Sequence, residues 1–356
     1  MRYDGTVVCG VDLGDRFSRV CVLSEVSGET VREWRVATTP TALRASFGSY
    51  APMRIALEVG THSPWVSRLL AELGHKVFVA NARKVRLISQ NRRKDDRIDA
   101  EYLARLLRVD PKLLAPIRHR GAHAQVDLAV LRSRNALVKA RAGLINHVRG
   151  VVKATGRRLP GASSESFAAT ANAALPTDLV GALAPLLEMI AGLSAAIRGT
   201  EERLSALATA AYPETALLRQ VHGVGLLTSL AFVLTIEDPT RFRRSRSVGA
   251  YFGLVRARQQ SGDTDPERHI TKEGDPFMRK LLVGCAHHIL EPFGKDCDLR
   301  RYGTSLAAGG SKRAKKRAVV AVARKLAVLL HRLWVDQATY DPFYNLNRST
   351  RGTHAA

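Results

Sequence analysis

The order of apolar runs in the first third of the chain restricts the fold more than any other feature of the sequence. Three strand-like runs follow one another with only short polar or glycine-containing turns between them, and helical and strand-like patterns then alternate. This order predicts an α/β region in which helices pack on a mixed sheet. The expected strands are residues 7–14, 19–26, 30–37, 54–59 and 76–81, and the expected helices are residues 41–50, 63–74 and 95–109.

Four carboxylates have informative positions in this layout. Asp12 lies in the first expected strand and Glu58 ends the fourth, and we expect these two strands to be neighbours in the sheet. Asp96 and Asp99 are three residues apart on the last of these helices, so they share a face. An acidic side chain in an apolar strand is costly unless something pairs with it, and a hard divalent cation, Mg²⁺ or Mn²⁺, would be such a partner. Taken singly, each acid is better explained as a turn residue or a solvent-facing helix residue, but the four together favour a metal site.

The middle of the chain is predicted to form a long helical arm. Residues 127–158 and 182–207 have helical patterns, and a break over residues 159–167 separates them. Two long helices with a loop at the far end are typical of an antiparallel arm or coiled coil. The sequence leaves open whether this arm is a packed spacer or a dimerisation arm that also touches nucleic acid. The basic residues that would make the contact are Arg132, Arg134, Lys139 and Arg141.

The last part of the chain is expected to be mainly helical and to contain a turn similar to a helix-hairpin-helix. In that turn, Gly223 and Gly225 would let backbone N–H groups approach a DNA phosphate. The expected regions are residues 1–118 for the sheet domain, 119–210 for the arm, 211–345 for the C-terminal domain and 346–356 for a disordered tail.

The net charge indicates the class of partner. The chain contains 55 Lys and Arg residues against 32 Asp and Glu residues, a formal charge of +23. Such an excess suits a polyanion, nucleic acid first and an acidic membrane surface second. We expect no membrane-spanning apolar run and no signal peptide, which favours nucleic acid and a cytoplasmic location. The four cysteines form no C-x-x-C pair and are expected to be reduced.

Residues 256–274 are too rich in Gly, Pro and charge for a strand or a long helix, and Ser261 stands in the middle of this loop beside Gly262. Taken alone, Ser261 is an ordinary loop serine. Residues 241–356 contain 23 Lys and Arg against 10 Asp and Glu, an excess that suits phosphate contacts. The basic residues around Ser261 are Arg256, Arg258, Arg268 and Lys272, and those at the start of the helix expected over 311–335 are Lys312, Arg313, Lys315, Lys316 and Arg317.

Several motifs, in this order along the chain, carry a resemblance to a known family. They are "GVDLG", "ALEVGTHSPWVSRLL", "KDDRIDAEYLARLL", "QVHGVGLLTSLAFVLTIEDPTRFRRSRSVGAYFGLVRARQQSG", "ITKEGDPFMRKLLV" and "KKRAVVAVARKLAVLLHRLW". Together they span nearly the whole chain. The chain resembles transposases of the insertion-sequence one-hundred-ten family, relatives of the Piv DNA invertases.

The resemblance implies a RuvC-like, RNase H-type N-terminal domain with a D-E-D-D metal site. That site carries over to Asp12, Glu58, Asp96 and Asp99. It also implies a C-terminal transposase domain whose loop serine, here Ser261, attacks DNA, and recombination guided by a structured non-coding RNA. Because the carboxylates and the serine would come from different domains or subunits, we expect a homo-oligomer, either a dimer or a tetramer.

The sequence departs from the common family wording in two places, and neither removes a catalytic carboxylate. Where many members have K-T-D, this chain has Lys94, Asp95 and Asp96, so Asp95 competes with Asp96 as the ligand. After Glu58 the chain reads "VGTH", where "ATG" is common.

Two alternatives belong to other functional classes. A RuvC-like metal nuclease that forms no covalent intermediate needs only the N-terminal carboxylates, and it leaves the Ser261 loop unexplained. A non-enzymatic nucleic-acid-binding protein accounts for the charge and for the turn at Gly223 and Gly225, but not for acids placed in apolar strands. A recombinase accounts for all of these features.

Overall fold

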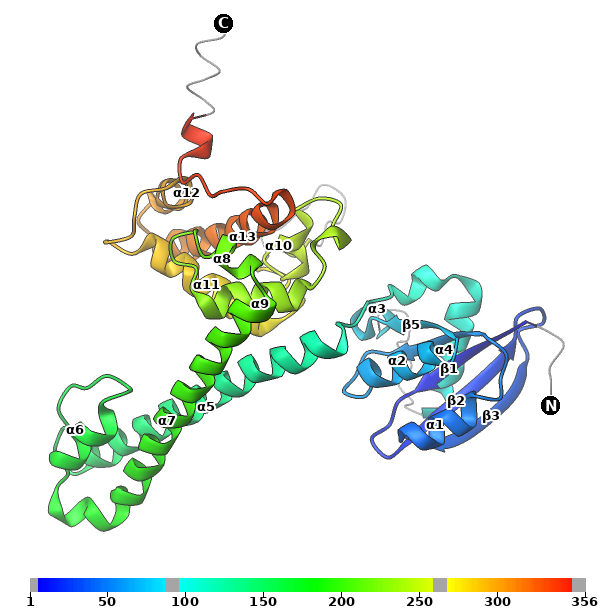
Figure 1. The fold of residues 1–356 in the computed structure, drawn as a ribbon, viewed down its shortest axis with the longest axis horizontal. Coiled ribbons are helices and arrows are strands. Elements are labelled where there is room, and N and C mark those ends of the chain that lie inside the picture. Colours follow the sequence, from blue (N-terminus) through cyan, green and yellow to red (C-terminus); the bar gives the residue numbers. More distant parts are fainter. Residues whose placement is uncertain (1–5, 87–95, 259–267, 348–356) are drawn as a thin grey trace, which may run out of the picture. The chain divides into compact units, whose positions relative to one another are not determined.

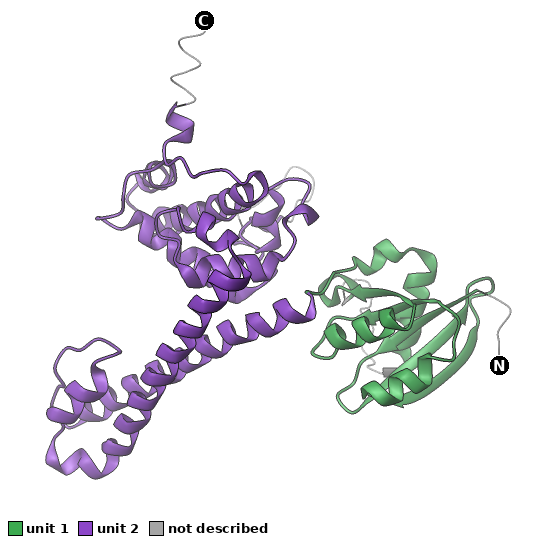
Figure 2. Cartoon of the chain, in the orientation of Figure 1, with its two compact units in different colours: residues 1–120 green, residues 121–356 purple. Residues whose placement is uncertain are grey.

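The computed structural model describes residues 6–86, 96–258 and 268–347. The chain divides into two compact units, residues 1–120 and 121–356, which Figure 2 distinguishes by colour. The first unit is an α/β unit with a mixed sheet, and the described part of the second unit is mostly helical, as the sequence predicts.

The first unit is built on a sheet in the order β3-β2-β1-β4-β5 (Figure 1). β2 runs antiparallel to both β1 and β3, whereas β4 runs parallel to β1 and to β5. The prediction of a mixed sheet with the first and fourth strands as neighbours is therefore confirmed. The strands are β1 (Val7–Asp12), β2 (Phe17–Ser24), β3 (Thr30–Ala37), β4 (Arg54–Glu58) and β5 (Lys76–Ala80).

The helices of the first unit pack on both faces of this sheet, so each face has its own apolar core. Cys9 and Val11 of β1 belong to one core with residues of α1 and α2, and Val8 belongs to the other core with residues of α4. This division follows from the two-residue period of a strand. The elements are α1 (Pro40–Phe47), α2 (Ser63–Glu72), α3 (Ala82–Arg86), α4 (Asp96–Val109) and the 3₁₀ turn η1 (Pro111–Leu114), of which α3 and η1 were not foreseen.

Two long antiparallel helices, α5 (Ala122–Ala154) and α7 (Val180–Ala211), form the arm of the second unit (Figure 1). Guanidinium groups on α5 join them: Arg134 bonds to Glu201, and Arg141 donates to Ser194 Oγ at 3.1 Å. At the far end of the arm, a separate core forms between these two helices, α6 (Phe167–Ala173) and the segment that carries η2 (Thr177–Leu179).

The structure corrects one expectation about the arm and bears on one alternative that the sequence left open. Residues 177–211 are long and apolar enough to span a membrane by length and composition, because Ala and Gly interrupt the larger side chains without adding charge. Length and composition in a single helix are weak evidence for a membrane span. Arg141 is only 6% exposed and Arg134 is paired with Glu201, so these two arginines hold the arm together. Arg132 likewise pairs with Asp275 at 2.9 Å.

The remaining helices of the second unit surround one apolar core, in which α9 is almost completely buried. His331 of α13 contacts both ends of the basic segment 239–245. Its Nε2 donates to the Pro239 carbonyl at 2.9 Å, and its Nδ1 lies 3.0 Å from Ser245 Oγ, within hydrogen-bond distance. The elements are α8 (Glu214–Leu218), α9 (Leu226–Ile236), η3 (Pro239–Arg241), α10 (Ser247–Tyr251), α11 (Pro276–Leu290), α12 (Asp298–Ala307) and α13 (Lys312–Asp336).

Candidate functional site

Asp12 and Glu58 end two neighbouring parallel strands. Val11 of β1 is in register with Leu57 of β4, so the residues that follow them, Asp12 and Glu58, stand side by side. Neighbouring strands are about 4.8 Å apart, and side chains at matching positions point to the same face. Both residues are half-buried. The structure therefore brings together two of the four predicted carboxylates at the carboxyl ends of the neighbouring strands β1 and β4.

Helix α4 covers the face to which these carboxylates belong. Gly10, two residues before Asp12, lies against the backbone of α4: a Cβ at Gly10 would be 2.0 Å from the carbonyl oxygen of Ala100. The other end of α4 lies near the β2–β3 turn, since Arg108 Nε donates to the Glu25 carbonyl at 2.9 Å. The helix thus runs with its N-terminal turns toward Asp12.

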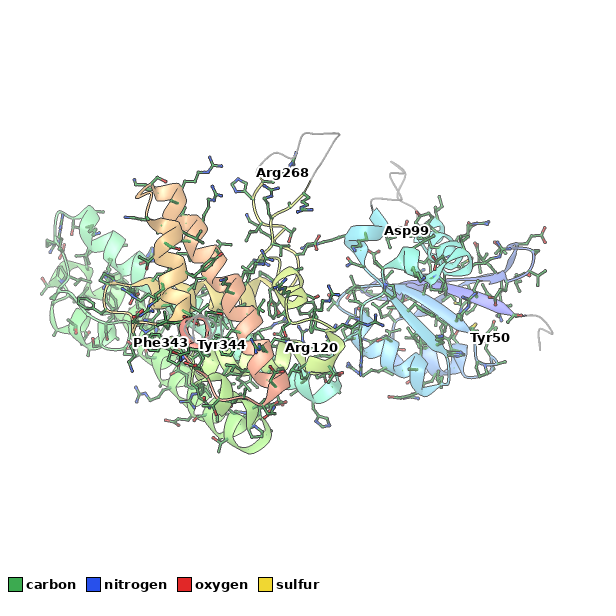
Figure 3. All side chains as sticks on the ribbon, turned by 90° about the horizontal axis from the view of Figure 1, so that it is seen from above. Tyr50, Asp99, Arg120, Arg268, Phe343 and Tyr344 are labelled. Atoms are coloured by element: carbon green, nitrogen blue, oxygen red, sulfur yellow. The ribbon has the colours of Figure 1, made fainter. Side chains whose placement is uncertain are left out.

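Asp96 and Asp99 belong to those N-terminal turns. Asp96 is the first residue of α4, and only its backbone is described. Asp99 is exposed (Figure 3) and directly precedes Ala100, the α4 residue whose backbone packs against Gly10 of β1. Asp95, the competing ligand, lies outside the described residues. In the described part of the chain, no three His, Cys, Asp or Glu side chains are close enough together to hold a metal ion. The donors that are described, carboxylate oxygens at one end of the sheet, fit a hard divalent cation.

One residue next to the carboxylates was missed in the sequence. Arg19 of β2 is the cross-strand partner of Asp12, and its side chain is exposed. The two-residue alternation of the hairpin formed by β1 and β2 was the signal that could have revealed it.

The loop that contains Ser261 is anchored by its two ends, while Ser261 itself lies outside the described residues. Ala257 N donates to the His269 carbonyl at 3.0 Å, and Thr271 N donates to the Val255 carbonyl at 2.9 Å. These antiparallel contacts bring the two predicted basic groups on either side of Ser261 near each other. Arg258 and Arg268 are exposed, and Figure 3 labels Arg268.

A basic groove of about 1470 Å³ lies between this loop and α13. Its described lining includes eleven Lys and Arg residues against three Asp residues. The floor is apolar and includes Leu254, Val328 and Leu329. The groove unites two basic clusters that are far apart in the sequence. The predicted residues that line it are Arg256, Arg268, Lys272, Lys312, Arg313, Lys316 and Arg317, and the unforeseen ones are Arg246, Arg324, Lys325 and Arg332.

The other predicted contacts lie outside this groove. Arg258 and Lys315 are exposed but are not part of its lining. Gly223 has a φ of +86°, and a Cβ there would be 3.2 Å from Ile289 on α11. Gly225 is the residue before α9. The glycine turn is therefore shaped by its packing on α11.

Comparisons with known proteins place both halves of this arrangement in one kind of enzyme. Residues 9–156, which contain the four carboxylates, match a sequence family of transposases of the DEDD, IS110 type. Residues 215–296, which contain Ser261, match the family described as "Transposase IS116/IS110/IS902 family".

Curated relatives agree with these matches. The chain is 29% identical over 255 residues to the transposase for insertion sequence element IS1111A of Coxiella burnetii, which covers 69% of this chain and 68% of the relative. It is 28% identical over 308 residues to a probable family 20 transposase of Pseudomonas aeruginosa, covering 84% and 89%. A third relative, 29% identical over 283 residues and covering 78% and 82%, is the transposase for IS1328 of Yersinia enterocolitica.

The sheet with its carboxylates and the basic helical region thus belong to a transposase, an enzyme that acts on DNA. The chain is a member of the IS110 family of insertion-sequence transposases. Membership in a DEDD family also indicates the use of a divalent metal.

Proposed function

We propose that this transposase cleaves and rejoins DNA strands through a covalent serine–DNA intermediate, with Ser261 as the nucleophile. The observation that carries metal-assisted strand cleavage is the position of Asp12 and Glu58 at the ends of neighbouring parallel strands, on the face that α4 covers. Ser261 is proposed as the nucleophile because its loop resembles that of the family. When bound there, Mg²⁺ or Mn²⁺ would supply Lewis acidity at a phosphate oxygen. The residues that would hold it are Asp12, Glu58, Asp96 and Asp99.

The proposed reaction exchanges one phosphate ester for another. The Ser261 oxygen forms a bond to phosphorus as its proton leaves, and the bond from phosphorus to one deoxyribose oxygen breaks. That oxygen takes up a proton. In strand exchange, the hydroxyl of a second strand attacks the serine ester and releases Ser261. Because the number of phosphate ester bonds is unchanged, no external energy source is needed.

The cations around the loop suit the charge that this reaction handles. Arg256, Arg268 and Lys272 line the basic groove from the loop side and would offset charge on the pentacovalent phosphate. The cluster at the start of α13 lines the opposite part and would bind phosphates of the nucleic-acid backbone.

We further propose the RuvC-like, RNase H-type fold for the sheet domain, residues 1–118, and a transposase domain over residues 211–345. The mixed order of the sheet, with β1 and β4 as central parallel neighbours, supports the first assignment. Residues 346–356 are proposed as the tail.

The arm, residues 119–210, is proposed to be a coiled coil through which subunits form a dimer or a tetramer. The buried positions of α7 support a coiled coil, because their spacing alternates between four and three residues, with one gap of seven residues between Ile197 and Leu204. These positions are Leu183, Leu187, Ile190, Ser194, Ile197, Leu204 and Ala208.

A structured non-coding RNA is the proposed guide. The charge of +23 and the basic groove suit contacts with the phosphates of a guide RNA as well as with those of DNA, and they support this proposal. An enzyme that acts on DNA with an RNA guide would work in the cytoplasm, at the nucleoid.

The test is to trap the intermediate. The full chain is mixed with RNA transcribed from the non-coding segment beside its gene, with labelled DNA spanning the ends of its element, and with Mg²⁺. Denaturation should leave labelled DNA attached to the protein. Attachment should disappear in Ser261→Ala and on chelation of the metal, and Ser261→Cys should retain weak activity because a thiolate is more nucleophilic but prefers softer metals.

Thr264→Ala is the matched control, since it removes another hydroxyl from the same stretch of sequence. It should form the adduct as the parent does. Nicked DNA without an adduct in Ser261→Ala would replace the serine mechanism by the nuclease alternative, in which the carboxylates activate water. No cleavage by the parent under any of these conditions would argue for a binding protein.

A further inference from the structure

Three side chains extend the carboxylate site across the sheet. Asp12 of β1 is in register with Arg19 of β2, and Arg19 is in register with Arg35 of β3. Phe17 is two residues before Arg19 on the same strand. Because side chains at matching positions and at every second position share a face, all four belong to one face of the sheet.

That face is only partly covered by α4. Cys21 and Leu23, which follow Arg19 on the same face of β2, are buried in the core beneath the helix. Arg19 and Arg35 are exposed, and Phe17 is 46% exposed. The open part of the face therefore begins beside Asp12 and extends toward the edge strand β3.

Arg19 and Arg35 stand directly opposite one another, and the anions on the same face, Asp12 opposite Arg19 and Glu33 two residues before Arg35, lie to either side of the pair and not between its two guanidinium groups. Like charges directly opposite one another on neighbouring strands destabilise the pair. In the described part of the chain, no carboxylate forms an ion pair with Arg19 or Arg35. Arg35 instead lies over the ring of Phe17, with its guanidinium carbon 3.7 Å from the ring centroid. A phosphate between the two guanidinium groups would relieve their repulsion.

An exposed aromatic ring beside unpaired cations is typical of a surface that binds unpaired nucleotides. Bases stack on aromatic rings and on guanidinium planes, while the cations follow the backbone. Arg35 is two strand spacings from Asp12, about 10 Å, which is a distance of a few nucleotides at most. The platform is therefore near enough to hold the same strand whose phosphate reaches the carboxylates.

We propose that Phe17, Arg19 and Arg35 form a platform that binds unpaired nucleotides of the DNA strand next to the phosphate that is cleaved. The arginines bind its flanking phosphates, and Phe17 stacks on a base. This inference rests on the proposed function, because it takes Asp12 and Glu58 as the place of cleavage.

The experiment compares two double variants of the full chain that lose the same formal charge from the same unit. Arg19→Ala/Arg35→Ala removes the cations of the platform. The control, Arg32→Ala/Arg44→Ala, removes cations from the other side of the sheet. There the guanidinium carbon of Arg32 lies 5.0 Å from the centroid of the Trp34 ring, and a guanidinium nitrogen of Arg44 lies 2.7 Å from a carboxylate oxygen of Glu72. Binding of a single-stranded oligo(dT) is titrated over a range of salt concentrations, with oligo(U) as the RNA probe.

The platform variant should show a smaller slope of log Kd against log salt, by about 1.4 if two single-strand phosphate contacts are lost, whereas the control keeps the parent slope. Equal slopes for both variants would overturn the proposal. A reduced slope for oligo(U) only would assign the platform to RNA and would also overturn it as a DNA site.

Phe17→Trp supplies a local readout that does not depend on the rest of the chain. Oligo(dT) should quench more fluorescence in this variant than in the parent, and Arg19→Ala/Arg35→Ala should remove that extra quenching. Absence of extra quenching while the oligonucleotide is bound would overturn the stacking role. Strand cleavage is measured in parallel: a parent that binds through the platform but never cleaves DNA refutes the proposed function and leaves the platform in place.

Discussion

The replacement Gly10→Ala tests the contact that positions α4 on the sheet. The added Cβ would be 2.0 Å from the carbonyl oxygen of Ala100 and 2.7 Å from the backbone nitrogen of Ala104. Both are backbone atoms, so no side-chain rotation can relieve the overlap, and α4 must move away from β1 by more than an ångström. Overpacking usually costs about 1–3 kcal/mol, and a backbone clash belongs at the upper end. At about 3 kcal/mol, local opening of α4 would become roughly 100-fold more frequent.

Amide hydrogen exchange of the peptide that contains α4 measures this opening directly, and cleavage of element DNA measures its effect on the carboxylates. We expect faster exchange in α4 and lower cleavage, because Asp96 and Asp99 move with the helix while Asp12 stays on β1. Gly143→Ala is the control: that glycine lies in α5 with open space around it, and the change should stabilise the helix by up to about 1 kcal/mol. Normal exchange and normal cleavage in Gly10→Ala would refute the packing argument.

Three further predictions use other parts of the molecule. Asp12→Asn and Glu58→Gln should abolish strand cleavage but leave RNA binding intact, and Asp95→Asn should be milder than Asp96→Asn; the reverse order in a cleavage assay would identify Asp95 as the ligand. Nucleic-acid affinity should fall on the order of 10³-fold between low and moderate salt if six or more phosphates are neutralised. A variant without the charges at the start of α13 should show a weaker dependence of affinity on salt; the residues to replace are Lys312, Arg313, Lys315, Lys316 and Arg317. An unchanged slope in salt titrations would mean that these five side chains contact solvent and not phosphates. Burial lowers the pKa of His75 from its usual 6.5, so as the pH falls the imidazole is protonated in the unfolded chain before it is protonated in the folded chain. The free energy of unfolding of the first unit should therefore decline as pH falls below about 6.5. Unfolding curves at mildly acid pH should show a smaller decline in His75→Gln.

The α/β region was largely predictable because its strands are short, apolar and arranged in a simple order. Apolar runs bounded by short polar or glycine-containing turns located β1 to β5, and three such runs in a row before the alternating helices indicated a mixed sheet. The position of Arg19 was not predicted, because strand register can slip by one residue without changing the composition of either strand, and such a slip reverses the face of every side chain.

Long-range packing explains the other differences. The basic groove joins Arg256 to Lys312, and nothing local in either segment indicates that the other is near. Arg141 was one of the residues that an arm touching nucleic acid would use, but its position on α5 faces Ser194, so the helical pattern around it rather than its charge determines its burial. Ser261 and Asp95 lie outside the described residues, and the roles proposed for them rest on the sequence.

The hydrogen bonds between the arm helices also make the arm a spacer whose length can be changed in steps. Arg134 meets Glu201 and Arg141 meets Ser194, so seven residues forward along α5 correspond to seven residues backward along α7. Removing one such block from each helix would shorten the arm by about 10 Å while keeping every remaining pair in register. Removing it from one helix alone would keep the apolar positions in the seam but would shift every pair beyond the cut by seven residues, so that the hydrogen-bonded partners there no longer meet. A graded series of matched deletions would therefore vary the separation between the two ends of the arm without altering either end.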